Sequence, residues 1–163
     1  MRIASLAISL SFLAACANVQ EPEAIHDRPL TEVTRLANSG NLEAVHDLCY
    51  RYVYGSNAPI DYEKAMHWCT RGASLGADSS QVLLAEIYLN GHGTPVNYQQ
   101  AHYWYSAAAK TGHEHALLML YYIYRDGLGL EANQEKADAY LQQAVSSGYQ
   151  PAIEVQEAAA QSR

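Results

Sequence analysis

Apolar residues recur along this chain at helical spacing, in short runs separated by glycine and proline residues. Ala44, Leu48 and Tyr52 follow one another at intervals of four residues, which places them on one face of a helix. After a break, Ala65 and Trp68 begin a second helical face. The glycine and proline residues of the break supply turn geometry and prevent a continuous helix. The pattern therefore predicts a helical hairpin.

The hairpin pattern returns every 36 residues and is marked by Gly40, Gly76, Gly112 and Gly148. Four other kinds of position keep this step: Leu48, Leu84 and Leu120; Tyr52, Tyr88 and Tyr124; Ala65, Ala101 and Ala137; Trp68, Trp104 and Tyr140. An aspartate or asparagine precedes each second helix, where its side-chain oxygen can accept hydrogen bonds from free amides: Asp61, Asn97 and Asn133. One hairpin cannot bury its apolar face alone, so the three are expected to stack.

The predicted fold is all-α: an α/α solenoid of three 36-residue helical hairpins with N- and C-terminal capping helices. The domain is expected to span residues 29–163, with the hairpins at about 41–76, 77–112 and 113–148. The segment before the first hairpin matches only the end of a second helix. The segment 149–161 matches a lone first helix, so both segments are predicted to cap the solenoid.

The second hairpin carries a motif that resembles the Sel-1-like (SLR) repeat, a relative of the tetratricopeptide repeat. Its matching residues are Leu84, Tyr88, Gly91-His92-Gly93-Thr94-Pro95-Val96-Asn97, Ala101, Trp104, Ala108-Ala109 and Gly112. Ser80 stands where the other hairpins have alanine. The first hairpin departs further, because Cys49 and Cys69 replace the usual small and aromatic residues. The resemblance implies a right-handed superhelix of antiparallel helices and an adaptor role in protein complexes.

Residues 1–15 have the layout of a lipoprotein signal peptide. Arg2 precedes an apolar run, and the sequence Leu13-Ala14-Ala15-Cys16 resembles the lipobox of bacterial lipoproteins. The resemblance implies that Cys16 becomes the mature N-terminus and carries the lipid. The apolar run is shorter than the roughly 20 residues that a transmembrane helix needs. The alternative is an ordinary secreted protein with a chance cysteine at its cleavage site.

Residues 16–28 are predicted to form the lipidated N-terminus and a flexible tether, because this stretch is polar and contains Glu21-Pro22-Glu23. Ala17 follows the lipidation site. In lipoproteins of two-membrane bacteria, an aspartate at that place usually signals retention in the inner membrane. The protein is therefore expected to be exported and lipid-anchored at the outer membrane, facing the periplasm.

The chain is acidic, with 17 Asp and Glu residues against 10 Lys and Arg residues and a formal net charge of −7. Nucleic acids and anionic lipid headgroups both require positive charge on the protein that binds them. The composition argues against both as partners. We expect a protein or peptide partner, and contact with the membrane through the lipid on Cys16.

Cys49 and Cys69 form a candidate disulfide bond. In the hairpin, Cys49 faces the second helix near Ala65, and Cys69 lies one turn beyond that alanine. An exported protein meets an oxidising compartment, which favours a bridge if the two Cα atoms come within roughly 4.4–6.8 Å of each other. The alternative is two separately buried thiols, since cysteine is a common core residue.

The resemblance also implies that the first helices line a concave surface, into which the side chains not used for stacking point. Carried across the repeat register, the candidate partner-binding positions are Glu43, His46, Tyr50 and Val53; Ser79, Val82, Glu86 and Leu89; His115, Leu118, Tyr122 and Arg125. This mixture of aromatic, aliphatic and charged residues suits a peptide or a protein element. The alternative is a solvated groove, with partners on the convex side or the loops.

No motif in the sequence supports catalysis, a metal site or a cofactor. His113 and His115 are two residues apart and diverge by about 200° on a helix, so they do not chelate one ion together. The chain lacks a Gly-x-Ser-x-Gly elbow, a phosphate-binding loop and the helix motif of metalloproteases. We therefore predict a binding protein that is not an enzyme.

The leading functional interpretation is a periplasmic, membrane-anchored lipoprotein that acts as an interaction scaffold or adaptor through its repeat surface. A second is an immunity protein that neutralises a toxic effector delivered into the periplasm, such as a phospholipase. The resemblance implies this second role because lipid-anchored SLR proteins can act in that way. A third is a peptidoglycan- or β-lactam-binding protein, although the chain lacks the cysteine pair in every repeat that such proteins carry.

Overall fold

The computed structural model describes residues 24–161, and in this range the chain forms helices and turns without a strand. The elements are the 3-10 turn η1 (Ile25–Asp27) and the α-helices α1 (Leu30–Asn38), α2 (Leu42–Tyr54), α3 (Tyr62–Ser74), α4 (Asp78–Asn90), α5 (Tyr98–Ala109), α6 (Glu114–Asp126), α7 (Gln134–Ser146) and α8 (Gln150–Gln161). The predicted signal peptide, the lipidation site Cys16 and the first part of the tether lie outside the described residues. None of the helices in 24–161 is both long and apolar enough to cross a bilayer.

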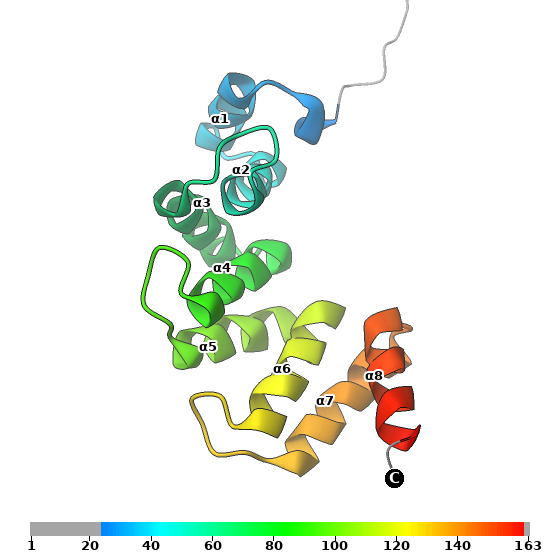
Figure 1. Ribbon diagram of the computed structural model, residues 1–163. Helices are drawn as coiled ribbons and strands as arrows, with labels where there is room; N and C mark the ends of the chain where they lie inside the picture. The colour runs from blue at the N-terminus through cyan, green and yellow to red at the C-terminus, as the bar shows by residue number, and fades with distance from the viewer. Residues whose placement is uncertain (1–23, 162–163) are drawn as a thin grey trace, which may run out of the picture.

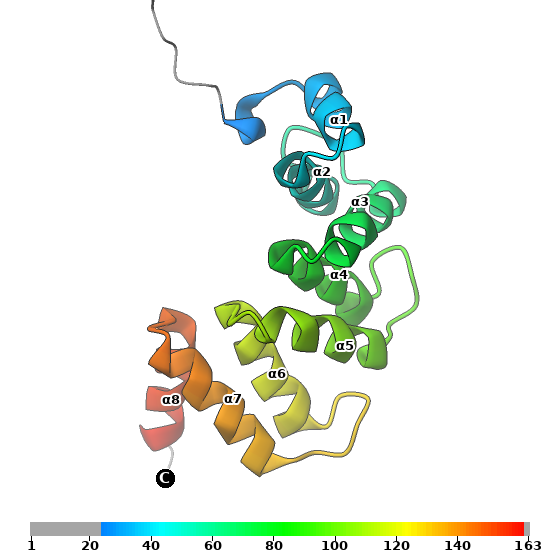
Figure 2. The same cartoon turned by 180° about the vertical axis from the view of Figure 1, so that it is seen from behind.

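The helices stack as three antiparallel hairpins, α2 with α3, α4 with α5, and α6 with α7 (Figure 1). The single helices α1 and α8 cover the two ends of the stack, which confirms the predicted all-α solenoid with capping helices. The stack is curved, and α2, α4, α6 and α8 lie on its concave side, to the right in Figure 1. Seen from behind, α5 and α7 come to the front (Figure 2).

Side-chain caps explain where the second helix of each hairpin begins. Asp61, Asn97 and Asn133 each accept a hydrogen bond through Oδ1 from the amide three residues ahead, at 3.0, 3.0 and 2.9 Å. The predicted caps are therefore confirmed. Asn41 caps α2 in the same way, at 2.8 Å from the amide of Ala44. Each cap satisfies one of the amides that the first helical turn leaves without a partner.

The linker within each hairpin has two residues with left-handed backbone. Both are glycine in the second linker, whereas the first linker has a glycine and an asparagine at these places. Gly93 has φ 68°, and a Cβ atom there would lie 2.7 Å from Cβ of Tyr62. Asn57 occupies the same place one repeat earlier and has φ 55°. Asparagine enters this region more readily than most residues. The first linker therefore departs from the motif in sequence but keeps its conformation.

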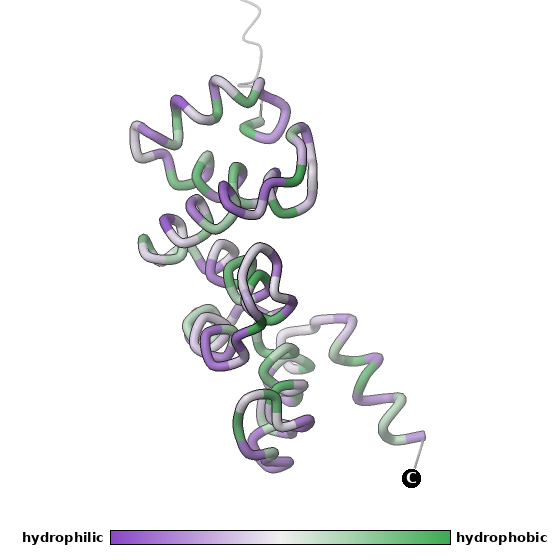
Figure 3. The backbone as a smooth tube through the Cα atoms, turned by 60° about the vertical axis from the view of Figure 1, so that its left-hand side comes forward, coloured by the Kyte–Doolittle hydropathy of each residue, from purple (hydrophilic) through white to green (hydrophobic). Residues whose placement is uncertain are grey.

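The buried residues form three successive clusters along the described stack. Ala65, Ala101 and Ala137 have no exposed surface, which lets the two helices of each hairpin approach closely. Trp104 packs against both the first and the second cluster, and Tyr140 against both the second and the third. Large aromatic residues thus fill the wedge between neighbouring hairpins. In Figure 3, hydrophobic and hydrophilic residues alternate along each helix, as expected where one face is buried.

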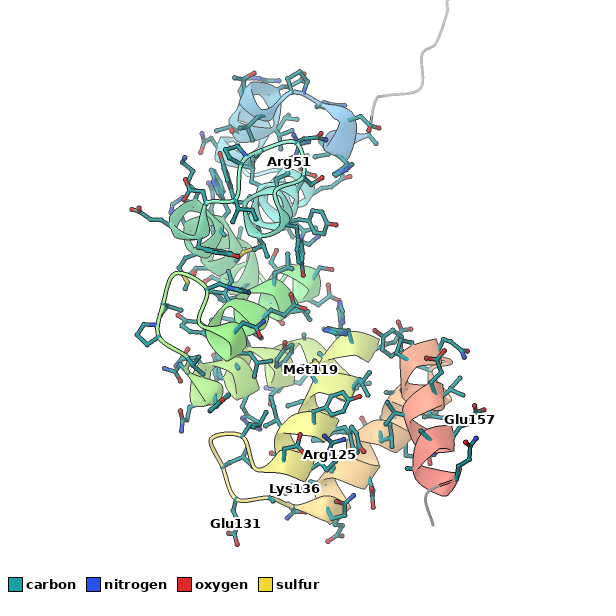
Figure 4. The ribbon with its side chains drawn as sticks, in the orientation of Figure 1. Arg51, Met119, Arg125, Glu131, Lys136 and Glu157 are labelled. Carbon is teal, nitrogen blue, oxygen red and sulfur yellow. A yellow bond between two sulfur atoms is a disulfide. The ribbon has the colours of Figure 1, made fainter. Side chains whose placement is uncertain are left out.

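The end of the predicted tether differs from the expectation, because residues 25–28 fold onto the first hairpin. Ile25 is only 8% exposed. The guanidinium of Arg51 (labelled in Figure 4) is fully buried and donates to the carbonyl oxygens of Ile25, His26 and Arg28 at 3.0, 2.8 and 3.1 Å. A buried guanidinium needs acceptors on several sides, and Asp47 on the same helix provides the ion pair. Residues 25–28 therefore belong to the folded domain, and the prediction that they are part of a flexible tether is wrong.

Candidate functional site

The concave face of α2, α4 and α6 is the candidate binding surface. Of the predicted positions, three side chains are exposed and six are half-buried: Glu43, Tyr50 and Arg125; His46, Ser79, Glu86, Leu89, His115 and Tyr122. These nine residues come from all three hairpins. The structure thus assembles a mixed aromatic and polar surface that crosses both boundaries between hairpins.

The prediction was wrong for three of the concave positions, because Val53, Val82 and Leu118 are each only 5% exposed. The prediction placed these three residues among the side chains that stacking leaves free. Each first helix is also covered by the neighbouring unit, so its apolar stripe is wider. Leu118, for example, packs in one cluster with Ala152 of α8. These aliphatic residues belong to the core and do not offer their side chains to a partner.

A chain of side-chain hydrogen bonds runs along the concave face from the first hairpin to the C-terminal cap. The Tyr54 hydroxyl donates to Oε2 of Glu86 at 2.6 Å, which joins α2 to α4. Oε1 of Glu86 lies 3.2 Å from Nε2 of His115 on α6. The other ring nitrogen of His115, Nδ1, lies 3.2 Å from the hydroxyl of Tyr149, directly before α8. We name these four residues the concave ladder.

Two members of the concave ladder, Tyr54 and Tyr149, were missed by the sequence reasoning. Neither is repeated at the 36-residue step, since the residues that follow Tyr54 in register are Asn90 and Asp126. The periodicity therefore holds no signal for them. Their contacts depend on how far one hairpin rotates against the next, which a repeat pattern does not encode.

The ladder shifts the titration of its tyrosines. Burial raises the pKa of Tyr54 above its ordinary value, and the hydrogen bond to Glu86 raises it further. Burial also raises the pKa of Tyr149, with smaller contributions from Glu114 and Glu86. Both hydroxyls therefore stay protonated at neutral pH, which keeps the Tyr54 hydroxyl a donor to the Glu86 carboxylate.

His46 lies on the same face, with Nδ1 3.4 Å from Oγ of Ser80 in the next hairpin. Burial lowers the pKa of His46, and this effect exceeds the opposite influence of Asp47 and Asp78. A lowered pKa keeps the imidazole neutral at pH 7. His46 therefore contributes a neutral polar contact between hairpins and no positive charge.

Aromatic rings are concentrated at both ends of the concave face. Tyr50 and Tyr54 lie with their ring centroids 4.8 Å apart at the N-terminal end. At the other end the guanidinium carbon of Arg125 (Figure 4) lies 4.8 Å from the ring centroid of Tyr122. The same guanidinium donates to both carboxylate oxygens of Asp126, at 2.6 and 2.7 Å. Arg125 is therefore an ion-paired group that stacks on a tyrosine ring.

Cys49 and Cys69 are joined by a disulfide bond in the structure, with an S–S distance of 2.04 Å and a Cα–Cα distance of 4.8 Å. The bond links α2 to α3, and both cysteines are fully buried. It staples the hairpin that departs most from the repeat motif. It lies in the core and contributes no group to the concave face.

Residues 24–161 contain no group of three His, Cys, Asp or Glu side chains placed to hold a metal ion. His113 precedes the first turn of α6 and His115 lies within it, and the ring nitrogens of His115 contact Glu86 and Tyr149. The concave face therefore presents hydrogen-bonding side chains and aromatic rings to a binding partner.

Comparison with known proteins fits the repeat geometry. The family model described as Sel1 repeat matches residues 42–76, 78–113 and 115–149, which is well over half of the chain. The chain belongs to the Sel1 repeat family. The three matches coincide with the hairpins α2–α3, α4–α5 and α6–α7 to within a few residues. A comparison with curated proteins found no match.

Solved structures share the Sel1 repeat architecture. A Sel1 repeat protein from Oxalobacter formigenes is 26% identical with a TM-score of 0.68, and the match covers 77% of this chain and 94% of that one. The protective antigen c5321 of uropathogenic Escherichia coli, which has an SLR fold, is 31% identical with a TM-score of 0.72; the match covers 75% of this chain but 26% of that one. Cysteine rich protein B of Helicobacter pylori is 19% identical, has a TM-score of 0.63 and matches 79% of this chain and 98% of its own, which shows a common fold alone.

Proposed function

We propose that this protein is an envelope lipoprotein that binds a segment of a protein partner along its concave face. Sel1 repeats are in general protein–protein interaction modules. The observation that supports the concave face is the strip of tyrosines, Tyr50, Tyr54, Tyr122 and Tyr149, that spans the stack from the first hairpin to the cap. Tyrosine supplies contact area and a hydrogen bond at low entropic cost, and is enriched in binding hot spots.

Two charged residues beside the tyrosine strip, Glu86 and Arg125, are already paired, which limits the kind of partner. Glu86 is bonded to Tyr54 and His115, and Arg125 is bonded to Asp126. A charged side chain of the partner in the middle of the strip would lose its hydration without gaining an ion pair. We therefore propose an uncharged, apolar or aromatic segment as the part of the partner that lies on the tyrosines.

The test uses the mature lipidated protein with a photo-crosslinking amino acid at position 50 or 122. A crosslinked partner is expected from these positions, and the Tyr50→Ala, Tyr122→Ala double variant is expected to lose that partner in affinity capture from envelope extracts. Tyr103→Ala is the matched control, because Tyr103 is 60% exposed on α5, a second helix. Equal recovery by the double variant and the wild type would contradict the concave site and leave the fold intact.

The lipid anchor is a separate part of the proposal and has its own test. The lipobox-like sequence before Cys16 supports it. Cells expressing the full chain with a labelled fatty acid are expected to incorporate label into the wild type, and the Cys16→Ser variant is expected to lose it. Fractionation of the envelope then tests the outer-membrane location. Label retained by Cys16→Ser would refute lipidation at this residue.

The immunity role is the second candidate. The net charge of −7 on a small chain agrees with it, because opposite charge on a toxic effector would speed association with such a protein. Deletion of the gene should then sensitise cells to one effector delivered into the periplasm, for example a phospholipase. Cells that stay insensitive to the effector encoded beside the gene would remove this candidate. Sedimentation with purified cell wall tests the third one, peptidoglycan binding.

A further inference from the structure

The convex side carries a groove between the second and third hairpins that the proposed function does not use. It measures about 490 Å³ and lies between α5 and α7, which Figure 2 shows at the front. Its wall is formed by two lysines, two tyrosines and small or uncharged residues: Lys110, Lys136, Tyr124, Tyr140, Ser106, Ala109, Ala139 and Gln143. The volume falls in the range of roughly 300–1,000 Å³ that ligand sites occupy.

The positive charge in this groove is unusual for the molecule. The sequence contains three lysines, and two of them, Lys110 and Lys136, line this one groove in a chain of net charge −7. Its lining includes no carboxylate, and neither lysine forms an ion pair with any of residues 24–161. Glu131 lines a second hollow, which adjoins the groove because Lys136 lines both. Both residues are labelled in Figure 4.

The repeat itself shows that these lysines are not required by the fold. One repeat earlier, Ser74 stands in the place of Lys110 and Gln100 stands in the place of Lys136. The earlier hairpins pack normally around these uncharged residues. The pair of lysines is therefore particular to the groove between α5 and α7.

The tyrosines give the groove an ordered aromatic wall. The rings of Tyr124 and Tyr140 are stacked, with centroids 5.6 Å apart and an interplanar angle of 14°. The Tyr124 hydroxyl is held 3.0 Å from Nε2 of His102, and Nζ of Lys136 lies 5.2 Å from the centroid of the Tyr124 ring. The wall thus offers aromatic surface next to the ammonium group of Lys136. The cation–π contact with the Tyr124 ring favours this position of the ammonium group.

We propose that this convex groove binds an acidic, aromatic segment of a protein partner, with a carboxylate between Lys110 and Lys136 and a planar or apolar side chain against Tyr124 and Tyr140. Charge complementarity selects the acidic segment, because the net negative charge of the rest of the protein repels such a segment from other surfaces. The protein then has two binding faces of different chemistry, an uncharged tyrosine strip on the concave side and a cationic aromatic groove on the convex side.

The test titrates the mature protein, expressed without the signal peptide, with an N-acetylated and C-amidated peptide of three Glu-Phe repeats. Chemical-shift changes of backbone amides locate the binding, and the same titration gives the dissociation constant. The uncharged peptide of three Gln-Phe repeats is the ligand control. The variant Lys110→Ser, Lys136→Gln carries the residues that the preceding hairpins already tolerate, and Lys64→Gln is its control, because Lys64 makes the same kind of contact with Tyr52, at 5.4 Å.

The acidic peptide is expected to shift amides of α5 and α7, and the double lysine variant is expected to weaken its binding about fivefold or more, as loss of two charge contacts implies. The control variant Lys64→Gln is expected to bind the acidic peptide as the wild type does. The double variant is expected to keep the melting temperature of the wild type. The proposal is overturned if the double variant binds as well as the wild type, if the Gln-Phe peptide binds equally, if the shifts lie on the concave face, or if no binding occurs at millimolar peptide.

Discussion

The hydroxyl of Tyr54 donates a hydrogen bond of 2.6 Å to Glu86, a residue 32 positions away in the next hairpin. This contact begins the concave ladder, which continues through His115 to Tyr149. Nearest-neighbour contacts of this kind set the cooperativity of a solenoid, because each hairpin is stabilised only by the units beside it.

Tyr54→Phe removes the hydroxyl and keeps the ring, so it tests this contact directly. We expect the free energy of unfolding to fall by about 0.5–1.5 kcal/mol, the net contribution of a typical hydrogen bond, because this bond is exposed and solvent screens the carboxylate charge. Tyr50→Phe is the control, since its ring lies beside Tyr54 without a hydroxyl bond to Glu86. Urea unfolding of both variants measures the difference, and equal losses would show that the ladder does not couple the hairpins.

Arg51→Met is expected to be strongly destabilising, by about 3–5 kcal/mol, because it leaves the largely buried carboxylate of Asp47 with only its contact to His26, at 3.2 Å. It also removes the donors that hold the carbonyl oxygens of residues 25–28. Hydrogen exchange at the amides of 25–28 should accelerate together with the loss in urea stability. Arg71→Met is the control, because Arg71 only stacks on Trp68, at 5.4 Å. An equal loss of stability in both variants would contradict the role of Arg51 in holding residues 25–28.

Reduction of the Cys49–Cys69 bond should destabilise the protein by about 3 kcal/mol, given the sequence separation of 20 between the two cysteines. Thiol titration of the oxidised mature protein in denaturant, with Cys16 replaced by serine, should find no free thiol. Two titratable thiols would mean that the cysteines are buried separately. The Cys49→Ala, Cys69→Ala variant should reproduce the loss in stability and become insensitive to reductant.

Tyr105→Phe is expected to stabilise the protein. The Tyr105 side chain is fully buried, and its hydroxyl has no hydrogen-bond partner among residues 24–161, which costs about 1–3 kcal/mol. Burial also raises the pKa of Tyr105 above its ordinary value. The unfolded chain then ionises first, so the native state loses stability as pH rises beyond the unfolded value of about 10.

The variant should therefore be more stable than the wild type at pH 7, and its advantage should grow between pH 10 and 11. Thermal unfolding at both pH values measures this difference. A variant that is less stable at pH 7 would mean that the hydroxyl has a partner, such as a buried water molecule.

The fold could be predicted from the sequence because its determinants are local and repeated. The caps Asp61, Asn97 and Asn133 and the glycine-rich linkers each act within a few residues of their position in the chain. Repetition every 36 residues then made each of these local signals visible three times.

The candidate binding surface could be predicted only in part, because it depends on contacts between units. The register placed Tyr50, Glu86 and Tyr122 on the concave side, but it could not show that Val82 and Leu118 are covered by the next unit. Arg51 gave no signal either. A single arginine on a helix looks like a surface residue in sequence, and its burial depends on a turn that lies before the first repeat.

If Cys16 carries the proposed lipid, that turn shortens the stretch of chain between the lipid and the folded domain. A tether reaching to residue 29 would span about 45 Å when fully extended, whereas a tether that ends at residue 24 spans about 28 Å, at roughly 3.5 Å per residue. The shorter length is about that of a bilayer's hydrocarbon core. On a chain anchored at Cys16, the tether would therefore hold residue 24, and with it the N-terminal end of the stack, within about 28 Å of the lipid-bearing residue.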